Sequence, residues 1–152
     1  MFYGCTVLTG VTIPDGVNSI GYSTFCGCTG LTSIAIPERV TAIGDEAFKN
    51  CTGITDVVVS DSVTEIGYRA FEGCSSLTSI TLPFVGATKD GSKNTHFGYI
   101  FGAFHYGGNP TCVPSGLQTL IITGGTSIAD CAFYYCTGLT SIEMPNSMTS
   151  IG

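Results

Sequence analysis

A cysteine recurs at a fixed interval along the first half of the chain, and this repeat constrains the fold more than any other feature. Cys5, Cys28, Cys51 and Cys74 are each 23 residues apart, and the segments between them align without gaps. Self-similarity at a period of about 20–50 residues is typical of solenoids, in which each unit packs on its neighbours. The repeat therefore predicts a stack of coils rather than a globular sandwich.

The repeat is interrupted once, after Cys74. The pattern returns at Leu117 and continues from Cys136, which lies 62 residues after Cys74, two periods and a further 16 residues. We therefore expect residues 1–152 to form a single array of about six stacked 23-residue coils, the last of them incomplete. The irregular coil spans residues 84–116 and contains an insertion of about 16 residues.

The coil that begins at Cys28 shows how one unit is built. Leu31, Ile34 and Ile36 have the spacing of a short parallel strand, which ends at Pro37 because proline cannot donate to a strand ladder. The rest of the coil supplies two more apolar anchors, a glycine for a tight bend and an Ala-Phe pair. These positions are Val40, Ile43, Gly44, Ala47 and Phe48. Ordering a coil costs about 1.5 kcal/mol per residue, more than so few anchors offset, so its stability must come from neighbouring coils.

The pattern L-x-x-I-x-I-P-x-x-V-x-x-I-G-x-x-A-F-x-x-C, read from Leu31 to Cys51, resembles the BspA-type leucine-rich repeat. It recurs in register over nearly the whole chain, apart from part of the insertion. Single positions depart from it: Ser60 and Thr123 replace the Pro, Thr24 the Ala, and Ala129 the Gly. The resemblance implies a leucine-rich-repeat solenoid, α/β or mainly β. It also implies an exported bacterial or protist surface protein that attaches to host or extracellular-matrix proteins.

The composition excludes several other classes. Five basic residues against eleven acidic ones give a net charge of −6, so the basic surface of a nucleic-acid-binding protein is missing. Apolar residues make up 43% and charged residues 11%, the opposite of a disordered chain. No apolar run approaches the roughly 18–20 residues of a membrane span, and residues 1–10 lack the regions of a signal peptide. We expect neither nucleic-acid binding nor membrane insertion, and a cell-surface or secreted location follows from the resemblance alone.

Five of the eight cysteines occupy one phase of the repeat and are expected to stack as a ladder about 4.8 Å apart. Parallel side chains at this spacing hold their Cβ atoms further apart than a disulfide prefers. We therefore interpret them as small buried apolar groups, with disulfide bridges as the less favoured alternative. The ladder comprises Cys5, Cys28, Cys51, Cys74 and Cys136. Cys26, Cys112 and Cys131 lie off the ladder and are predicted to be exposed thiols.

No arrangement of residues predicts an enzyme. His96 and His105 lie in the insertion near Asp90 and Cys112, but no third group orients either ring for nucleophilic catalysis. The cysteines and histidines lack zinc-ligand spacing, and the Gly-Gly pairs do not form a phosphate-binding loop. We therefore expect no catalytic site, metal or cofactor. A thiol- or histidine-dependent enzyme would require a reactive Cys112 or Cys131 with a low pKa.

The outward side chains of the strands form one candidate binding face. By alternation they are Gly10 and Thr12, Ser33 and Ala35, Asp56 and Val58, Ser79 and Thr81, Thr119 and Ile121, and Ser141 and Glu143. Most are small or β-branched, which suits a regular strand, and the Trp, Tyr and Arg clusters of a strong binding site are absent. We therefore expect this face to make weak or multivalent contacts at most. Its candidate contact residues are Asp56, Val58, Thr81 and Ile121.

The insertion is the most individual feature, with five aromatic residues between Phe97 and Tyr106. Insertions within repeats usually lie on one face, often the binding face. Ile100, Phe101, Ala103 and Phe104 are predicted to replace the missing core anchors, with Phe104 as the phenylalanine of the Ala-Phe pair. The candidate contact residues are Tyr99, His105 and Tyr106; for the two tyrosines, packing into the coil is an equal alternative.

The sequence as a whole predicts a non-enzymatic protein-recognition module of an exported surface protein, contacting host or matrix proteins through the sheet face and the insertion. The alternative is a structural spacer that binds nothing itself. Neither end shows a polar capping coil, which solenoids need to protect their terminal coils. We therefore expect the chain to be part of a longer protein and to associate end to end at high concentration.

Overall fold

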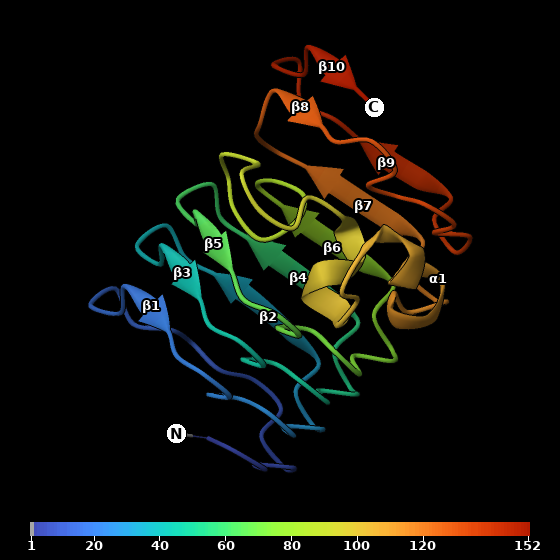
Figure 1. The fold of residues 1–152 in the computed structure, drawn as a ribbon. Helices are drawn as coiled ribbons and strands as arrows, with labels where there is room; N and C mark the ends of the chain where they lie inside the picture. Colours follow the sequence, from blue (N-terminus) through green and yellow to red (C-terminus); the bar gives the residue numbers. More distant parts are fainter. Residues whose placement is uncertain (1) are drawn as a thin grey trace.

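The computed structural model describes residues 2–152 and shows a parallel solenoid of six coils (Figure 1). The coils stack in chain order, with the N-terminus at one end of the stack and the C-terminus at the other. The solenoid predicted from the 23-residue period is therefore confirmed.

One face of the stack is a five-stranded parallel sheet in the order β2-β4-β6-β7-β9. Its strands are β2 (Ser33–Ile36), β4 (Asp56–Val59), β6 (Ser79–Leu82), β7 (Thr119–Ile122) and β9 (Ser141–Glu143). Residues one period apart pair, as Ile34 does with Val57 and Val57 with Ile80. Across the insertion Ile80 pairs with Leu120, so the extra residues leave this sheet in register.

A second row of two-residue strands goes beyond the single strand per coil expected from the sequence. The strands are β1 (Ser19–Ile20), β3 (Ala42–Ile43), β5 (Glu65–Ile66), β8 (Ser127–Ile128) and β10 (Ser150–Ile151). They form the parallel sheets β1-β3-β5 and β10-β8. The second row forms because the isoleucine of each Ile-Gly pair meets its counterpart one period away. The first coil lacks a strand of the long sheet, since residues 10–13 are not a strand. Immediately before the two segments, Thr32 N–H donates to Thr9 O (3.4 Å).

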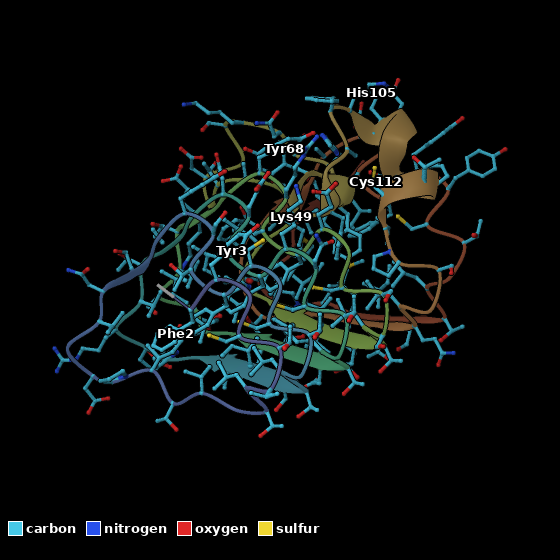
Figure 2. All side chains as sticks on the ribbon, turned by 90° about the horizontal axis from the view of Figure 1, so that it is seen from below. Phe2, Tyr3, Lys49, Tyr68, His105 and Cys112 are labelled. Carbon is cyan, nitrogen blue, oxygen red and sulfur yellow. The ribbon has the colours of Figure 1, made fainter. Side chains whose placement is uncertain are left out.

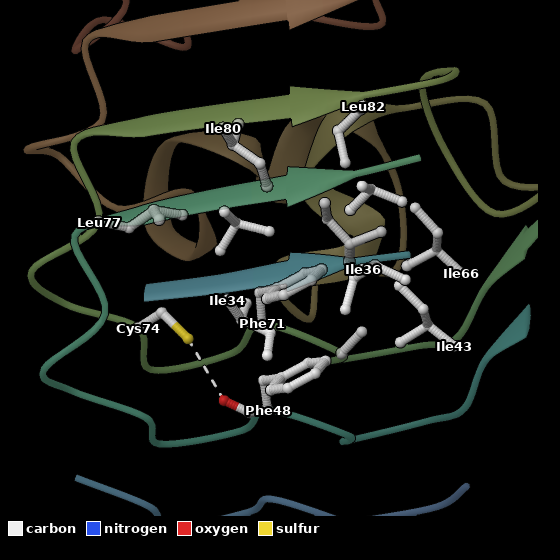
Figure 3. Close-up of a cluster of buried hydrophobic side chains, with 14 of the residues drawn as sticks. Ile34, Ile36, Ile43, Phe48, Ile66, Phe71, Cys74, Leu77, Ile80 and Leu82 are labelled. Atoms are coloured by element: carbon white, nitrogen blue, oxygen red, sulfur yellow. Dashed lines mark hydrogen bonds between the residues drawn. The ribbon is translucent and has the colours of Figure 1, made fainter. Parts of the chain in front are cut away.

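The core lies between the two rows of strands and the Ala-Phe turns (Figure 3). The phenylalanines form a continuous stack: Phe48 lies between Phe25 and Phe71, with ring centroids 5.3 and 5.4 Å away. All three rings are almost completely buried. Because each ring is covered by the coils on either side, the stack ties the stability of one coil to that of the next.

The glycine of the Ile-Gly pair has a different role from the bend expected at Gly44. The left-handed backbone lies elsewhere, as at Glu46 (φ 57°) and Asn50 (φ 58°), and the glycines of these pairs are not among the left-handed residues. A Cβ added at Gly44 would lie 2.9 Å from the carbonyl carbon of Gly21 and from the nitrogen of Tyr22. Glycine is therefore required here because two coils approach closely, not because the chain turns.

The insertion forms three short helical turns beside the Ala-Phe edge of the solenoid (Figure 1). They are the 3₁₀ helices η1 (Phe97–Phe101) and η2 (Tyr106–Gly108) and the single α-turn α1 (Asn109–Cys112). Ile100 O accepts from Phe71 N–H (2.9 Å), as Ala70 O accepts from Phe48 N–H (2.8 Å), so Ile100 and Phe101 replace the Ala-Phe pair.

One anchor predicted for the insertion is wrong. Ile100, Phe101 and Ala103 are buried as expected, but Phe104 is 78% exposed. The chain reaches the Ala-Phe position three residues earlier than predicted, because η1 turns tightly after Phe97. Phe104 is thereby left on the surface.

Candidate recognition surface

The long sheet presents a flat, weakly charged face. Ser33, Ala35 and Val58 are exposed as the alternation predicts, whereas Asp56, Thr81 and Ile121 are half-buried. The side chains are short and nearly level, so none offers a partner a large anchor. The structure places Asp56, Val58, Thr81 and Ile121 on one face, in neighbouring strands.

The repeating cysteines line an inner edge of the coil, and the thiols of three of them donate to carbonyl groups. Cys51 Sγ donates to Phe25 O (3.1 Å) and Cys74 Sγ to Phe48 O (3.3 Å; Figure 3). Cys28 Sγ likewise donates to Phe2 O (3.0 Å). Burial raises the pKa of Cys51 to about 12 and that of Cys136 to about 11, so these thiols stay neutral at physiological pH.

One of the three thiols predicted to be exposed is buried. Cys131 is exposed and Cys112 half-buried, but Cys26 is buried. Burial raises the pKa of Cys26, and the nearby carboxylates of Glu46 and Glu72 raise it further. The equivalent position in the next coil is Lys49, whose long side chain reaches solvent from the same site; the short Cys26 side chain does not.

Alkylation with iodoacetamide tests this placement. In the folded protein at pH 8, Cys131 is expected to react at the rate of a free thiol, because it is exposed. Cys51 and Cys74 are expected to react at least a hundredfold more slowly, and to label fully only in denaturant. Mass spectrometry of peptides from timed samples measures this. Equal rates at Cys51 and Cys131 would contradict the packing described above.

An aromatic surface runs from η1 to the edge of the fifth coil. Tyr68 contacts Tyr99 and Phe104, with ring centroids 5.4 and 5.3 Å away. Further along, Tyr106 contacts His105 and Tyr134, and Tyr134 contacts Tyr135 at 4.7 Å. We call this surface the aromatic platform; its members are Tyr68, Tyr99, Phe104, His105, Tyr106, Tyr134 and Tyr135. It lies on the side of the solenoid opposite the long sheet, where Figure 2 shows Tyr68 and His105.

Two hydrogen-bonded anchors fix the platform to the coils. Tyr68 Oη donates to Gly102 O (2.8 Å), which holds the end of η1 on the third coil. Asn109 is fully buried, its Oδ1 accepting from Gly98 N–H (3.0 Å) and its Nδ2 donating to Ala132 O (2.9 Å). The insertion is thus attached to the coils before and after it, and its exposed rings are held in place before any partner arrives.

A small charged cluster borders the platform. Lys49 Nζ lies 3.1 Å from Glu46 and 3.0 Å from Glu72, and the carboxyl hydrogen bonds raise the pKa of Lys49. The Arg69 guanidinium lies 5.0 Å from the centre of the Tyr68 ring. Because its acidic and basic groups balance, the cluster leaves the platform without a strong field of either sign.

The two histidines have separate surroundings. His105 is exposed, and its Nδ1 accepts from Gly107 N–H (3.0 Å) at the start of η2. His96 is buried with its ring edge-on to Tyr99, and burial lowers its pKa, so it stays neutral at pH 7. The Asp90 carboxylate is bonded to Thr88 and Ser92 instead of orienting either ring.

The platform contains four residues that were not singled out as contact residues from the sequence. Tyr68 and Phe104 belong to it, as do Tyr134 and Tyr135, while the half-buried Tyr99 packs against Tyr68. For Tyr134 and Tyr135, a comparison between coils of the sequence could have identified them as surface residues of interest. Tyr134-Tyr135 occupies the turn where the second coil has the polar pair Lys49-Asn50, and this aromatic replacement is next to the insertion.

Within residues 2–152, no group of three or more His, Cys, Asp and Glu side chains is arranged to hold a metal ion. The helices of this same stretch are all too short to cross a bilayer.

A parallel ladder of 23-residue coils, with an inner line of leucine and isoleucine, defines a leucine-rich-repeat solenoid. The chain belongs to the BspA-type leucine-rich repeat family. That family's model, described as "BspA type Leucine rich repeat region", matches in six copies over residues 1–91 and 114–152. The unmatched residues, 92–113, contain η1, η2 and α1, so the platform's inserted half lies outside the family pattern.

Several solved structures are similar to this chain. A leucine-rich repeat protein of T. pallidum is 28% identical, with a TM-score of 0.64 over 99% of this chain and 63% of that one. A leucine-rich repeat protein of Eubacterium ventriosum has the same fold at 20% identity, with a TM-score of 0.58 over 90% of this chain and 33% of that one. A leucine-rich cell surface protein of Faecalibacterium prausnitzii is 32% identical over 89% of this chain and 33% of that one, with a TM-score of 0.48. The chain thus spans about a third to two thirds of these proteins. Among curated proteins no match was found.

Proposed function

We propose that the chain is a non-enzymatic protein-recognition module of a cell-surface or secreted protein, and that it binds host or matrix proteins through the aromatic platform. The observation that carries this is the exposure of Phe104, Tyr106 and Tyr135 on a rigid support: 78%, 48% and 63% of each residue is exposed. Clustered exposed aromatic side chains beyond what packing needs are typical of protein contact sites.

Attachment to host or matrix proteins comes from family resemblance, and a fold alone does not define a partner. The contact residues come from the platform: Tyr106 and His105 as exposed anchors, with the half-buried Tyr99 packed against Tyr68. Asp56, Val58, Thr81 and Ile121 of the sheet face are a secondary contact area, because short side chains add area without an anchor.

Binding to a panel of immobilised, purified extracellular-matrix proteins tests the proposal. Tyr106→Ala is expected to weaken binding at least tenfold, because removing a central aromatic anchor costs about 1.4 kcal/mol or more. Surface plasmon resonance on the 152-residue chain measures the change.

Tyr3→Ala is the matched control, because Tyr3 is a 65% exposed tyrosine at the N-terminal end of the stack and makes no ring contact with the platform. We expect it to change binding less than twofold, and Val58→Lys less than threefold. Equal binding by the Tyr106→Ala variant would overturn the platform as the site. Failure of the unaltered chain to bind any of the panel would favour the structural spacer, the second candidate.

End-to-end association stays a prediction. Ile151 of the last coil is 64% exposed, and Phe2 of the first coil is 47% exposed. The first coil repeats the last one's apolar spacing, with Val17 and Ile20 corresponding to Met148 and Ile151. A second copy stacked on this face would therefore continue the apolar core in phase.

A further inference from the structure

The second row of strands is broken at the insertion. In the other coils each two-residue strand pairs with the next, but β5 and β8, on either side of the insertion, do not pair. Instead the inserted loop covers β5: Ile66 N–H donates to Ala87 O (2.9 Å), and Lys89 N–H to Thr64 O (3.0 Å). Glu65 and Thr88 form an antiparallel bridge there. The loop therefore satisfies β5 and leaves β8 without a neighbour on that side.

The uncovered edge of β8 presents two free N–H donors. In the third coil the equivalent donors bond to the preceding coil: Thr64 N–H to Thr41 O (2.8 Å) and Gly67 N–H to Ile43 O (2.7 Å). In the fifth coil these positions are Thr126 and Ala129, and within residues 2–152 neither N–H has an acceptor. The edge thus offers the hydrogen-bonding pattern that a parallel strand completes.

A cavity of about 250 Å³ lies against this edge, between β8 and the inserted loop. Its apolar wall contains Phe84, Ile122, Ile128 and Met148. Its polar rim includes Thr88, Lys89, Asp90, Thr126 and Ser127. The cavity lies between β8 and the loop that covers β5, and its apolar wall includes the isoleucine of β8.

The charges around the rim are mostly negative. Asp90 is held as a carboxylate by Thr88 and Ser92, and Glu65 lies beside it on the other side of the loop. Lys89 is one cation of the loop, and its Nζ donates to Asp61 O (2.7 Å). The Asp61 carboxylate, which accepts from Thr123, is the third acidic group, and the exposed Lys93 is the second cation. Three carboxylates against two ammonium groups leave these surroundings with a net negative charge, which favours a positively charged partner.

We propose that this site binds an extended, basic peptide segment of a partner protein, which adds to β8 as a parallel strand. Two of its carbonyl groups, two residues apart, accept from Thr126 and Ala129 as Thr41 and Ile43 do for the next coil. An apolar side chain on the second of these residues enters the cavity, as the buried Ile43 enters the core. Main-chain bonds give affinity and the pocket gives specificity.

The residue at position 129 determines where the bound peptide segment turns away from β8. Every regular coil has glycine at this phase, because a Cβ at Gly67 would meet Asp45 N and lie 2.5 Å from the carbonyl carbon of Gly44. Ala129 is the departure from that rule, and it occurs where the preceding main chain is missing. Its Cβ blocks the path of a continuing coil, so the bound segment turns away after its second bonded carbonyl.

Selection from a random hexapeptide library displayed on phage tests the proposal. The 152-residue chain is expected to enrich peptides of net positive charge, and the best of them is then synthesised. Hydrogen exchange measured by NMR on the unaltered chain is expected to slow at least tenfold at Thr126 and Ala129 when this peptide is added, with no change at Thr64. This readout needs no variant.

Ser127→Trp, which fills the rim of the cavity, is expected to weaken the peptide at least tenfold by fluorescence anisotropy. Ser150→Trp is the matched control, because Ser150 pairs with Ser127 in register and does not line the cavity, and it should leave affinity within twofold. Tyr106→Ala should also leave it unchanged, so failure at the platform and failure here are distinguishable. Enrichment of acidic peptides, no enrichment, or unchanged exchange at Thr126 and Ala129 would overturn the proposal.

Discussion

Phe48→Ala is expected to lower the free energy of unfolding by about 3–5 kcal/mol, because it removes a fully buried ring from the centre of the phenylalanine stack. Phe25 and Phe71 lie on its two faces, 5.3 and 5.4 Å away, and cannot both close the space without moving their coils. For a chain of this size such a loss lowers Tm by about 10 °C. Urea unfolding followed by far-UV circular dichroism measures it.

Phe104→Ala is the matched control for this change. It removes the same side chain from an exposed position that the sequence pattern had placed in the core. We expect a loss of about 0.5 kcal/mol or less, because surface substitutions away from special features have small effects. A Phe104→Ala loss as large as that of Phe48→Ala would mean that Phe104 is the buried member of the pair, as first expected from the sequence.

Gly67→Ala is expected to destabilise the protein by about 3 kcal/mol although it adds a single methyl group. The new Cβ would meet the backbone of Gly44 and Asp45 in the coil before it. Backbone atoms held in a ladder cannot move aside as a flexible side chain does, so the coils must separate locally. Thermal unfolding measured by calorimetry gives the size of the effect.

Gly16→Ala is the comparison for the Gly67 variant, because a Cβ at Gly16 meets nothing within 4 Å. It should be neutral or slightly stabilising, since alanine restricts the unfolded chain more than glycine does. If both variants lost the same stability, close approach between coils would not explain the glycine of the Ile-Gly pair.

The regular coils could be predicted from the sequence because the apolar anchors, the proline, the glycine and the Ala-Phe pair all recur at the same period. The anchors of the coil from Cys28, such as Leu31 and Ile34, recur at one period, and stacking neighbours is the one way to bury them. The short second strands were not predicted, since a pair such as Ala42-Ile43 is too brief for alternation to appear.

The insertion was less predictable because its residues have no counterpart in other coils to set their phase. By sequence, Ala103-Phe104 matches the Ala-Phe pair, but the tight turn of η1 brings Ile100 and Phe101 to that position instead. Asn109 gave no sequence signal, yet it holds the insertion to Ala132. Cys26 was wrongly predicted to be exposed, because exposure at this position of the coil depends on the length of the side chain. Lys49, at the equivalent position in the next coil, is long enough to reach solvent, and Cys26 is not.

The molecule therefore divides into a regular scaffold and one irregular coil with two features of its own. The insertion places the aromatic platform on one side and breaks the second row of strands on another. Both features depend on the same scaffold for rigidity, since Tyr68 and Asn109 fix the inserted turns to the coils on either side. In such an array, we expect the specific function to lie in the residues that depart from the repeat more than in the repeat itself.

The most direct test of this account is a hydrogen-exchange map of the chain bound to the matrix protein it captures from the panel. We expect protection over residues 97–112 and 131–135, which carry the platform, and unchanged exchange over the strands β4 and β7. Protection centred on β4, β6 and β7, with the platform left unprotected, would contradict the account.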